Sequence, residues 1–316
     1  MSAKFKAACI TGGAGFIGAH LARRLLKQNI SVCVLDNLSV GRIENVPPEA
    51  RFVHGDILNP GDCARALEGC DVLFHLAARV AIRASFEFVV EDTLCNVTGT
   101  ATVLRAAAQT GSVRKVVSAS SMAVYGDNAR ALPIPETRPA TPISPYGISK
   151  LALEQLTHRL AAVAGMESVA LRLFNTYGPG QRLSPYVGVI TIFTNALRAG
   201  TSPTIFGDGL QVRDFVHVQD VVSGFVQAME SPVTGETINI GTGAPQTVLE
   251  VFDLLARELA SDIPPTHVGA VPGELRYAIA SIEKAKYLLG YEPKYDFRKS
   301  VPGVVAEIIG HATESL

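Results

Sequence analysis

Short apolar runs alternate along the chain with segments whose apolar residues recur every three or four positions. The runs have the length and composition typical of buried strands: 7–10, 31–35, 51–54, 71–74 and 115–118. The helical segments are 17–25, 60–67, 85–108 and 145–164. Strand and helix alternate as far as Arg172, which predicts an α/β fold with a doubly wound parallel sheet. The proline-rich, less regular remainder predicts a second, smaller lobe over the carboxyl edge of that sheet, with a helix at 221–229 and a strand at 237–240.

The first strand leads into a glycine turn, residues 11–18, and then into a helix with Ile17, Leu21 and Leu25 on one face. This layout is typical of a dinucleotide site, in which the helix N-terminus faces the pyrophosphate. Gly12 permits a tight turn, Gly15 permits close approach of the phosphates, and Gly18 permits close helix packing. The G-x-x-G-x-x-G spacing alone is equally compatible with a glycine-rich turn that binds nothing.

The second strand ends in Asp36, about twenty residues after the glycines. A carboxylate there accepts hydrogen bonds from the adenosine ribose and repels a 2′-phosphate, so the sequence favours NAD over NADP. Two alternatives stay open: Arg42 could meet a 2′-phosphate, and Asp36 could only cap a turn. Asp56 follows the third strand, where it either contacts adenine or makes an ordinary turn.

The fourth strand ends in residues 75–78, where small side chains suit a cofactor lying against the backbone. We interpret His75 as a packed core histidine. In the helical segment 85–108, Leu94, Val97, Ala101 and Leu104 are expected on one stripe, with Asn96 among them. A buried asparagine needs partners, and the loop after the fourth strand can supply them.

Tyr146 and Lys150 share one face of a helix that Ser144 caps and Pro145 begins. An ammonium beside the phenol, reinforced by an oxidised nicotinamide, is expected to lower the phenol pKa, so that the tyrosine acts as a general base. The serines at 118–121 lie upstream, and they either make turns or place a hydroxyl at the ligand. A tyrosine and a lysine at this spacing also occur as an ordinary solvated pair.

Charge and composition limit the kinds of ligand and environment that we expect for this protein. The net charge is −1, without a strongly basic segment, which argues against nucleic-acid binding. No stretch has the roughly 18–20 apolar residues of a membrane span, and the start does not resemble a signal peptide, so we expect a soluble, cytoplasmic protein. The five cysteines lack C-x-x-C spacing and are interpreted as buried apolar residues. The scattered histidines predict no metal site.

The glycine signature, Asp36, Ser121, Tyr146 and Lys150 together resemble the extended short-chain dehydrogenase/reductase superfamily, in particular its branch of UDP-glucose 4-epimerase-like proteins in the NAD-dependent epimerase/dehydratase family. Further motifs support the resemblance: 171–175, 175–181, 204–209, 213–217 and 272–276. The resemblance implies three catalytic residues: Ser121, Tyr146 and Lys150. It implies that NAD contacts Gly12, Gly15, Phe16, Ile17, Gly18, Asp36, Asn37, Asp56, Ile57, Leu76, Ala77, Ala78, Asn96, Ala119, Tyr146 and Lys150. It implies that a UDP-sugar contacts Ser121, Asn175, Phe206, Arg213 and Arg276, with Phe206 at the uracil and the two arginines at the diphosphate.

The resemblance also implies how the chain divides. Residues 1–175 would bind NAD, with 214–241 returning to that domain, and 176–213 with 242–316 would bind the nucleotide sugar. Helices within 85–108 and 145–164 resemble those that pair in a dimer interface, so a homodimer is expected.

The expected activity is reversible inversion at C4 of a UDP-hexose through a 4-keto sugar. Related dehydratases and decarboxylases carry acidic residues directly after the active-site serine, whereas this chain has Met122 and Ala123, which cannot move a proton. Ala278 at the position near the sugar C2 substituent would admit an N-acetyl group, but an alignment shifted by one residue would place Tyr277 there. UDP-glucuronate is also possible, with Arg182 or Arg83 near its carboxylate. The alternative of another class is a non-catalytic NAD-binding relative.

Overall fold

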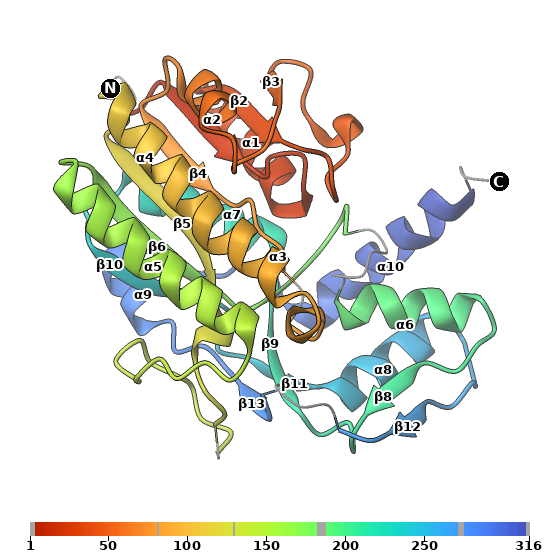
Figure 1. The fold of residues 1–316 in the computed structure, drawn as a ribbon. Helices are drawn as coiled ribbons and strands as arrows, with labels where there is room; N and C mark the ends of the chain where they lie inside the picture. Colours follow the sequence, from red (N-terminus) through yellow and green to blue (C-terminus); the bar gives the residue numbers. More distant parts are fainter. Residues whose placement is uncertain (1–3, 81, 129, 182–187, 271–274, 314–316) are drawn as a thin grey trace.

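The large sheet has seven parallel strands in the order β10-β6-β5-β4-β1-β2-β3 (Figure 1). The computed structural model describes residues 4–313 except 81, 129, 182–187 and 271–274. The strands are β1 (Ala7–Thr11), β2 (Ser31–Asp36), β3 (Arg51–His54), β4 (Val72–His75), β5 (Lys115–Ser121), β6 (Glu167–Leu173) and β10 (Glu236–Ile240). The strand order reverses between β1 and β4, and ligands of doubly wound sheets bind at such a switch point. The predicted fold class is confirmed.

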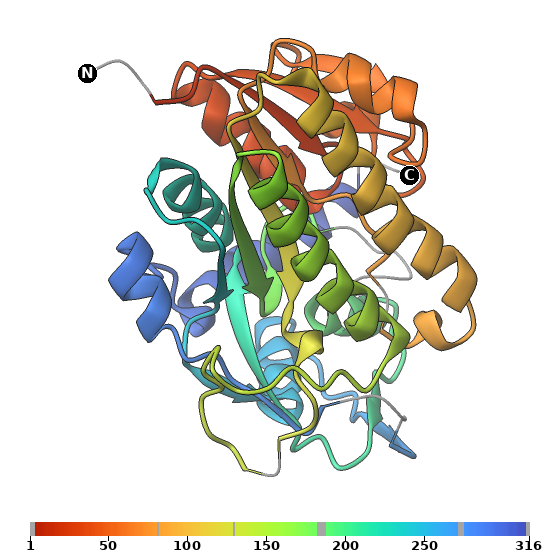
Figure 2. The same cartoon turned by 60° about the vertical axis from the view of Figure 1, so that its left-hand side comes forward.

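Helices cover both faces of this sheet (Figures 1 and 2). One layer consists of α2 (Pro60–Leu67), α4 (Thr100–Thr110) and α5 (Pro145–Val163). The other contains α1 (Phe16–Lys27) and α7 (Val218–Glu230), with α9 (Glu283–Leu289) beside β10. Leu21 and Leu25 of α1 are completely buried in one core cluster together with Ile10, as their helical spacing predicts. The two layers thus leave only the sheet edges for a site.

The smaller lobe lies beyond the carboxyl edge of the large sheet. Its strands are β7 (Asn175–Tyr177), β8 (Thr204–Phe206), β9 (Val212–His217), β11 (Pro245–Thr247), β12 (Thr266–Val268) and β13 (Tyr277–Ala278), and its helices are α6 (Val189–Arg198), α8 (Val248–Glu258) and α10 (Phe297–Thr313). Strand β9 pairs with β7, β11 and β13, while β8 pairs with β12. The segment 214–241 therefore contains the end of β9 as well as α7 and β10. The exact domain limits stay a prediction.

The segment 85–108 is not one continuous helix. It contains η2 (Ala84–Phe86), α3 (Val89–Thr93), a π-helical turn, η3 (Leu94–Gly99), and the start of α4. Each π turn takes up more residues than an α turn, so it rotates the buried face. Leu94, predicted on the buried stripe, is 47% exposed, whereas Asn96 and Thr100 are fully buried. The predicted stripe is wrong at Leu94 for this reason.

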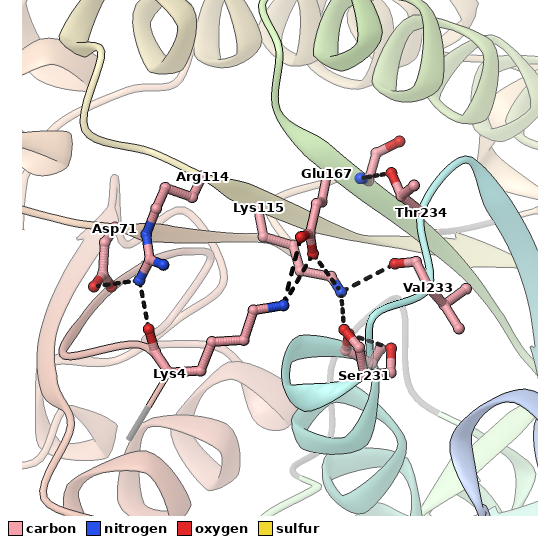
Figure 3. A network of polar contacts seen from close by, with 10 residues as sticks. Lys4, Asp71, Arg114, Lys115, Glu167, Ser231, Val233 and Thr234 are labelled. Atoms are coloured by element: carbon pink, nitrogen blue, oxygen red, sulfur yellow. Dashed lines mark hydrogen bonds and ion pairs between the residues drawn. The ribbon is translucent and has the colours of Figure 1, made fainter. Parts of the chain in front are cut away.

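The amino edge of the large sheet is held by a polar network (Figure 3). The Lys115 ammonium is fully buried, donates to the carbonyls of Ser231 and Val233, and pairs with Glu167 at 3.1 Å. Lys4 pairs with the same carboxylate at 3.3 Å. Burial lowers the pKa of Lys115, and the two carbonyls and the carboxylate compensate for the desolvation of its charge. This network joins β5, β6 and the end of α7 at the edge away from the glycine turn.

Two further observations concern the cysteines and the possible membrane or metal sites of the described residues. Cys9, Cys33, Cys63 and Cys70 are buried free thiols, as expected, while Cys95 is half-buried. Among the described residues, no helix is long and apolar enough to cross a membrane, and no cluster of His, Cys, Asp and Glu could hold a metal ion.

Candidate active site

The glycine turn brings β1, α1 and the end of β4 into close contact. Gly12 has φ +72°, and a Cβ there would lie 2.8 Å from the amide nitrogen of Ala77. A Cβ on Gly18 would lie 2.3 Å from the Gly12 carbonyl oxygen. Gly15 precedes α1, whose N-terminus no described side chain caps. A bound pyrophosphate could occupy this N-terminus, and a side chain at Gly15 would intrude there. The turn fits a dinucleotide, with Phe16 and Ile17 in the first turn of α1.

Asp36 lies at the end of β2 beside the glycine turn. Its carboxylate accepts hydrogen bonds from the amide of Ala14 at 3.0 Å and of Leu38 at 2.8 Å, and burial raises its pKa. It therefore does cap a turn, but each carboxylate oxygen keeps acceptor capacity for ribose hydroxyls. Asn37 Nδ2 donates to Asp56 Oδ2 at 2.9 Å, which brings the ends of β2 and β3 together. Asp36 and Asp56 therefore place carboxylate oxygens at the edge where the sequence predicts the adenosine part of NAD.

Asn96 holds the segment after β4, as predicted. Its Oδ1 accepts from the amide of Arg79 at 2.8 Å, and its Nδ2 donates to the Arg79 carbonyl at 3.0 Å. The same Nδ2 donates to Ser149 Oγ, which donates to the Tyr146 carbonyl. Residues 76–78, which include the expected contacts Leu76, Ala77 and Ala78, are thus fixed to the helix that carries Tyr146. Ile57, another expected contact, is buried against Gly99.

Ser121, Tyr146 and Lys150 come together at the carboxyl edge. Ser121 is the last residue of β5, and α5 begins at Pro145 with the predicted Ser144 cap, which accepts from the Gly147 amide at 3.1 Å. The Lys150 Nζ lies 5.8 Å from the centroid of the Tyr146 ring and donates to the carbonyl of Ala119 at 2.9 Å. All three side chains are buried.

Burial dominates the ionisation of this group. It raises the pKa of Tyr146 to about 12, although a hydrogen bond from Ser121 acts in the opposite direction. Burial also lowers the pKa of Lys150 to about 8. Among the protein's own groups burial has the largest effect on the phenol pKa, so the predicted lowering of that pKa by Lys150 together with an oxidised nicotinamide stays a prediction. A positive charge beside the phenol acts against this rise in pKa, because it favours the phenolate.

The expected substrate residues lie in and next to the smaller lobe. The Oδ1 of Asn175 is buried and has no hydrogen-bond partner among the described residues, as expected of a ligand contact. The Arg83 guanidinium carbon lies 3.9 Å from the centroid of Phe206, so the loop after β4 reaches the expected uracil residue. Arg213 is buried in β9 and donates to the Val212 carbonyl.

Arg276 forms a bidentate ion pair with Asp208, at 2.6 and 2.9 Å. This pairing lowers the pKa of the Asp208 carboxyl to about 2. A diphosphate that binds Arg276 would have to share its guanidinium with Asp208 or displace the Asp208 carboxylate. Arg182, an expected carboxylate partner, and residues 272–274 of the expected phosphate motif lie outside the described residues.

Sequence reasoning missed several residues that position α5, the helix that carries Tyr146 and Lys150. Ser85 Oγ accepts from the Tyr146 amide at 3.1 Å, and no local pattern indicates this contact. Glu154 pairs with Arg172 through two bonds of 2.8 Å, and both side chains are more than nine-tenths buried. Ser120 Oγ also donates to Glu154. The position of Glu154, four residues after Lys150, could have indicated that it lies on the same helix face.

Comparison with known proteins finds relatives that match nearly the whole chain. Residues 8–241 match the model of the NAD dependent epimerase/dehydratase family. The UDP-glucose 4-epimerase of Mycolicibacterium smegmatis is 36% identical over 304 residues, which cover 94% of this chain and 96% of that protein.

Solved structures with a similar fold include two UDP-sugar 4-epimerases. The UDP-glucose 4-epimerase of Thermotoga maritima, solved with UDP-glucose, superposes with a TM-score of 0.93 at 35% identity and covers 97% of this chain and 99% of that one. The UDP-glucuronic acid 4-epimerase of Bacillus cereus, solved with UDP-glucuronic acid and NAD, has a TM-score of 0.89 at 30% identity, covering 96% and 99%.

Proposed function

The chain belongs to the NAD dependent epimerase/dehydratase family, and from this membership we propose that it inverts C4 of a UDP-hexose through a 4-keto sugar. One observation carries the proposal: Ser121, Tyr146 and Lys150 are buried together at the carboxyl edge of the sheet, the same edge that carries a glycine turn that fits a dinucleotide. Met122 and Ala123 form the turn η4 (Met122–Val124) directly after Ser121 and are buried. Because neither can act as acid or base, these two positions lack the acidic groups that the related dehydratases and decarboxylases carry there.

In the proposed reaction Tyr146 accepts the proton of the C4 hydroxyl, and Ser121 donates a hydrogen bond to the same oxygen. NAD, when bound, supplies the hydride acceptor and donor and brings positive charge to the phenol. Lys150 contributes a second charge on the same helix face, held in place by the Ala119 carbonyl. When a hydride returns to the opposite face of C4 and the proton returns to the oxygen, the sugar has the opposite configuration at C4.

Inversion requires the keto sugar to present its other face without leaving the site. We assign retention of the nucleotide half to Asn175, Arg213 and Arg276. Guanidinium groups bind a diphosphate through paired hydrogen bonds, and binding energy from this remote part of the substrate keeps the intermediate bound. The Asp208 carboxylate at Arg276 would compete with the diphosphate for that guanidinium.

UDP-glucose with UDP-galactose is the proposed substrate pair, and the register of β13 bears on the alternatives. Ala278 pairs with Arg213, and Tyr277 pairs with Val212. Because side chains alternate along a strand, Ala278 lies on the face that Arg213 occupies. A small residue there favours space for an N-acetyl group, so UDP-N-acetylglucosamine is a second candidate. UDP-glucuronate is a third candidate, although the Arg83 guanidinium lies against Phe206, the expected uracil contact.

A panel of nucleotide sugars tests the proposal. The full chain is incubated with UDP-galactose, UDP-N-acetylgalactosamine and UDP-galacturonate, and the C4 epimer of each is measured. Tyr146→Phe should lower turnover by at least about 100-fold with the fold unchanged, because it removes only the proton-accepting oxygen. Bound NAD without any epimer would support the rival proposal, a non-catalytic NAD-binding protein.

We also propose that two copies of the chain associate through α3 and α5. Large apolar side chains are exposed on these neighbouring helices and on η3, which directly follows α3: Val90 of α3 is 63% exposed, Leu94 of η3 47% and Ile148 of α5 58%. Exposed apolar groups of this kind are typical of protein interfaces. Gel filtration at micromolar concentration should give about twice the mass of one chain, and a single-chain mass would exclude the dimer.

A further inference from the structure

A buried chain of hydrogen bonds crosses from the glycine turn to the helix opposite it. The Ala77 amide donates to Thr11 Oγ1 at 3.3 Å, and Thr11 Oγ1 lies 2.8 Å from His75 Nδ1. On the other side of the ring, His75 Nε2 lies 2.9 Å from Thr100 Oγ1. Thr100 Oγ1 donates to the Asn96 carbonyl at 2.6 Å. The Thr11, His75, Thr100 and Asn96 side chains are at most 1% exposed.

The direction of every bond in this chain follows from the protons available. The single hydroxyl proton of Thr100 is used on the Asn96 carbonyl, so His75 Nε2 must donate to Thr100 Oγ1. Burial lowers the pKa of His75 to about 3, so the ring is neutral and its Nδ1 carries no proton. Nδ1 therefore accepts the proton of Thr11. The imidazole has one tautomer, with the proton on Nε2.

The two ends of this series of hydrogen bonds hold the same short segment, residues 77–79. Thr11 binds the amide of Ala77, and Asn96, which accepts from Thr100, binds both the amide and the carbonyl of Arg79. This segment also lies against the glycine turn, because a Cβ on Gly12 would be 2.8 Å from the amide nitrogen of Ala77. The segment, the glycine turn and the π turn are therefore connected through one imidazole.

We propose that His75, as the Nε2–H tautomer, is a positioning residue that fixes residues 77–79 for the dinucleotide. The inference rests on the proposed function, which places NAD against this backbone. It assigns His75 no contact with substrate and no part in proton transfer. Loss of these hydrogen bonds should weaken NAD binding. The affinity for UDP, whose binding is assigned to the smaller lobe, should stay unchanged.

A second histidine provides a matched control. His158 also bridges two hydroxyls, with Nδ1 3.0 Å from Ser168 Oγ and Nε2 3.0 Å from Thr237 Oγ1. Ser168 is near the start of β6, so this bridge lies toward the amino edge of the sheet. A threonine-to-valine change removes a hydroxyl partner of Nε2 in either bridge. Only Thr100→Val removes the partner of His75.

The experiment measures dissociation constants for NAD and for UDP by titration calorimetry on nucleotide-free protein. Thr100→Val should weaken NAD binding about tenfold, because it leaves a buried N–H unsatisfied. Thr100→Ser keeps the hydroxyl and should stay within twofold of the unmodified protein. Thr237→Val should also stay within twofold. UDP affinity should be the same in all four proteins.

Failure of this proposal can be distinguished from failure of the proposed function. If the unmodified chain binds no NAD, the function itself fails, and the positioning role fails with it. If it binds NAD and Thr100→Val binds it equally well, only the positioning role is refuted. A structural readout is independent of binding: ¹⁵N spectra of histidine-labelled protein should show His75 neutral and protonated on Nε2 from pH 5 to 8. A proton on Nδ1, or titration in that range, would overturn the proposal.

Discussion

Gly18→Ala should destabilise the protein and abolish tight NAD binding. The added Cβ would lie 2.3 Å from the Gly12 carbonyl oxygen and 2.7 Å from the Gly13 Cα, whereas real Cβ contacts stay above 3.0 Å. Both neighbours are backbone atoms of the glycine turn and cannot rotate away. Helix α1 must therefore retreat from the turn by roughly 0.7 Å, the difference between 3.0 and 2.3 Å.

Overpacking of this kind costs about 1–3 kcal/mol, and here the favourable helix propensity of alanine, up to about 1 kcal/mol, offsets part of it. We expect a net loss of about 1–2 kcal/mol in the free energy of unfolding. The displaced helix N-terminus no longer faces the anion at the right distance, so NAD affinity should fall by at least tenfold.

Gly303→Ala is the matched control. Gly303 also lies in a helix, α10, but a Cβ there would have no neighbour within 4 Å. The same chemical change should stabilise by up to about 1 kcal/mol and leave NAD affinity unchanged. Urea unfolding and NAD titration on both variants measure the two effects. If Gly18→Ala is as stable as Gly303→Ala and binds NAD normally, the close packing at the turn does not have the role assigned to it.

Three further predictions concern charged groups. Glu154→Gln leaves the buried Arg172 guanidinium without its counter-charge and should cost about 3 kcal/mol in urea unfolding; a loss below 1 kcal/mol would contradict the buried pair. Burial lowers the pKa of Lys150 to about 8, so the ammonium is lost as the pH rises through that value. Catalytic efficiency should fall above pH 8, and Lys150→Arg, weaker overall, should lack that fall; an identical profile would exclude Lys150 as its source. Asp36→Ser should reduce the preference for NAD over NADP about tenfold in titrations, and an unchanged ratio would remove Asp36 from the ribose site.

The elements built from local patterns were predictable from the sequence. The glycine turn, Asp36 at a strand end, and the Ser144 cap before Tyr146 depend on residues a few positions apart, and the described structure contains each of them. The break in segment 85–108 was not predictable, because the π turn is set by what Asn96 and Thr100 meet in the fold.

Contacts between distant segments were also missed. Arg83 and Phe206 are 123 positions apart in the chain, and their stacking depends on how the smaller lobe lies over the large sheet. The burial that raises the pKa of Tyr146 was missed for a related reason. Sequence spacing identifies the neighbouring lysine, but it does not measure how completely the rest of the fold excludes water from the phenol.

The separation between the two edges of the large sheet has an evolutionary consequence. The ion pairs around Lys115 and Glu167 hold the strands together at one edge, while the groups assigned to chemistry lie at the other. Mutations can therefore accumulate in the loops at the carboxyl edge without weakening the contacts that hold the strands at the amino edge. A scaffold arranged in this way allows descendants to acquire new substrates while inheriting an unaltered framework.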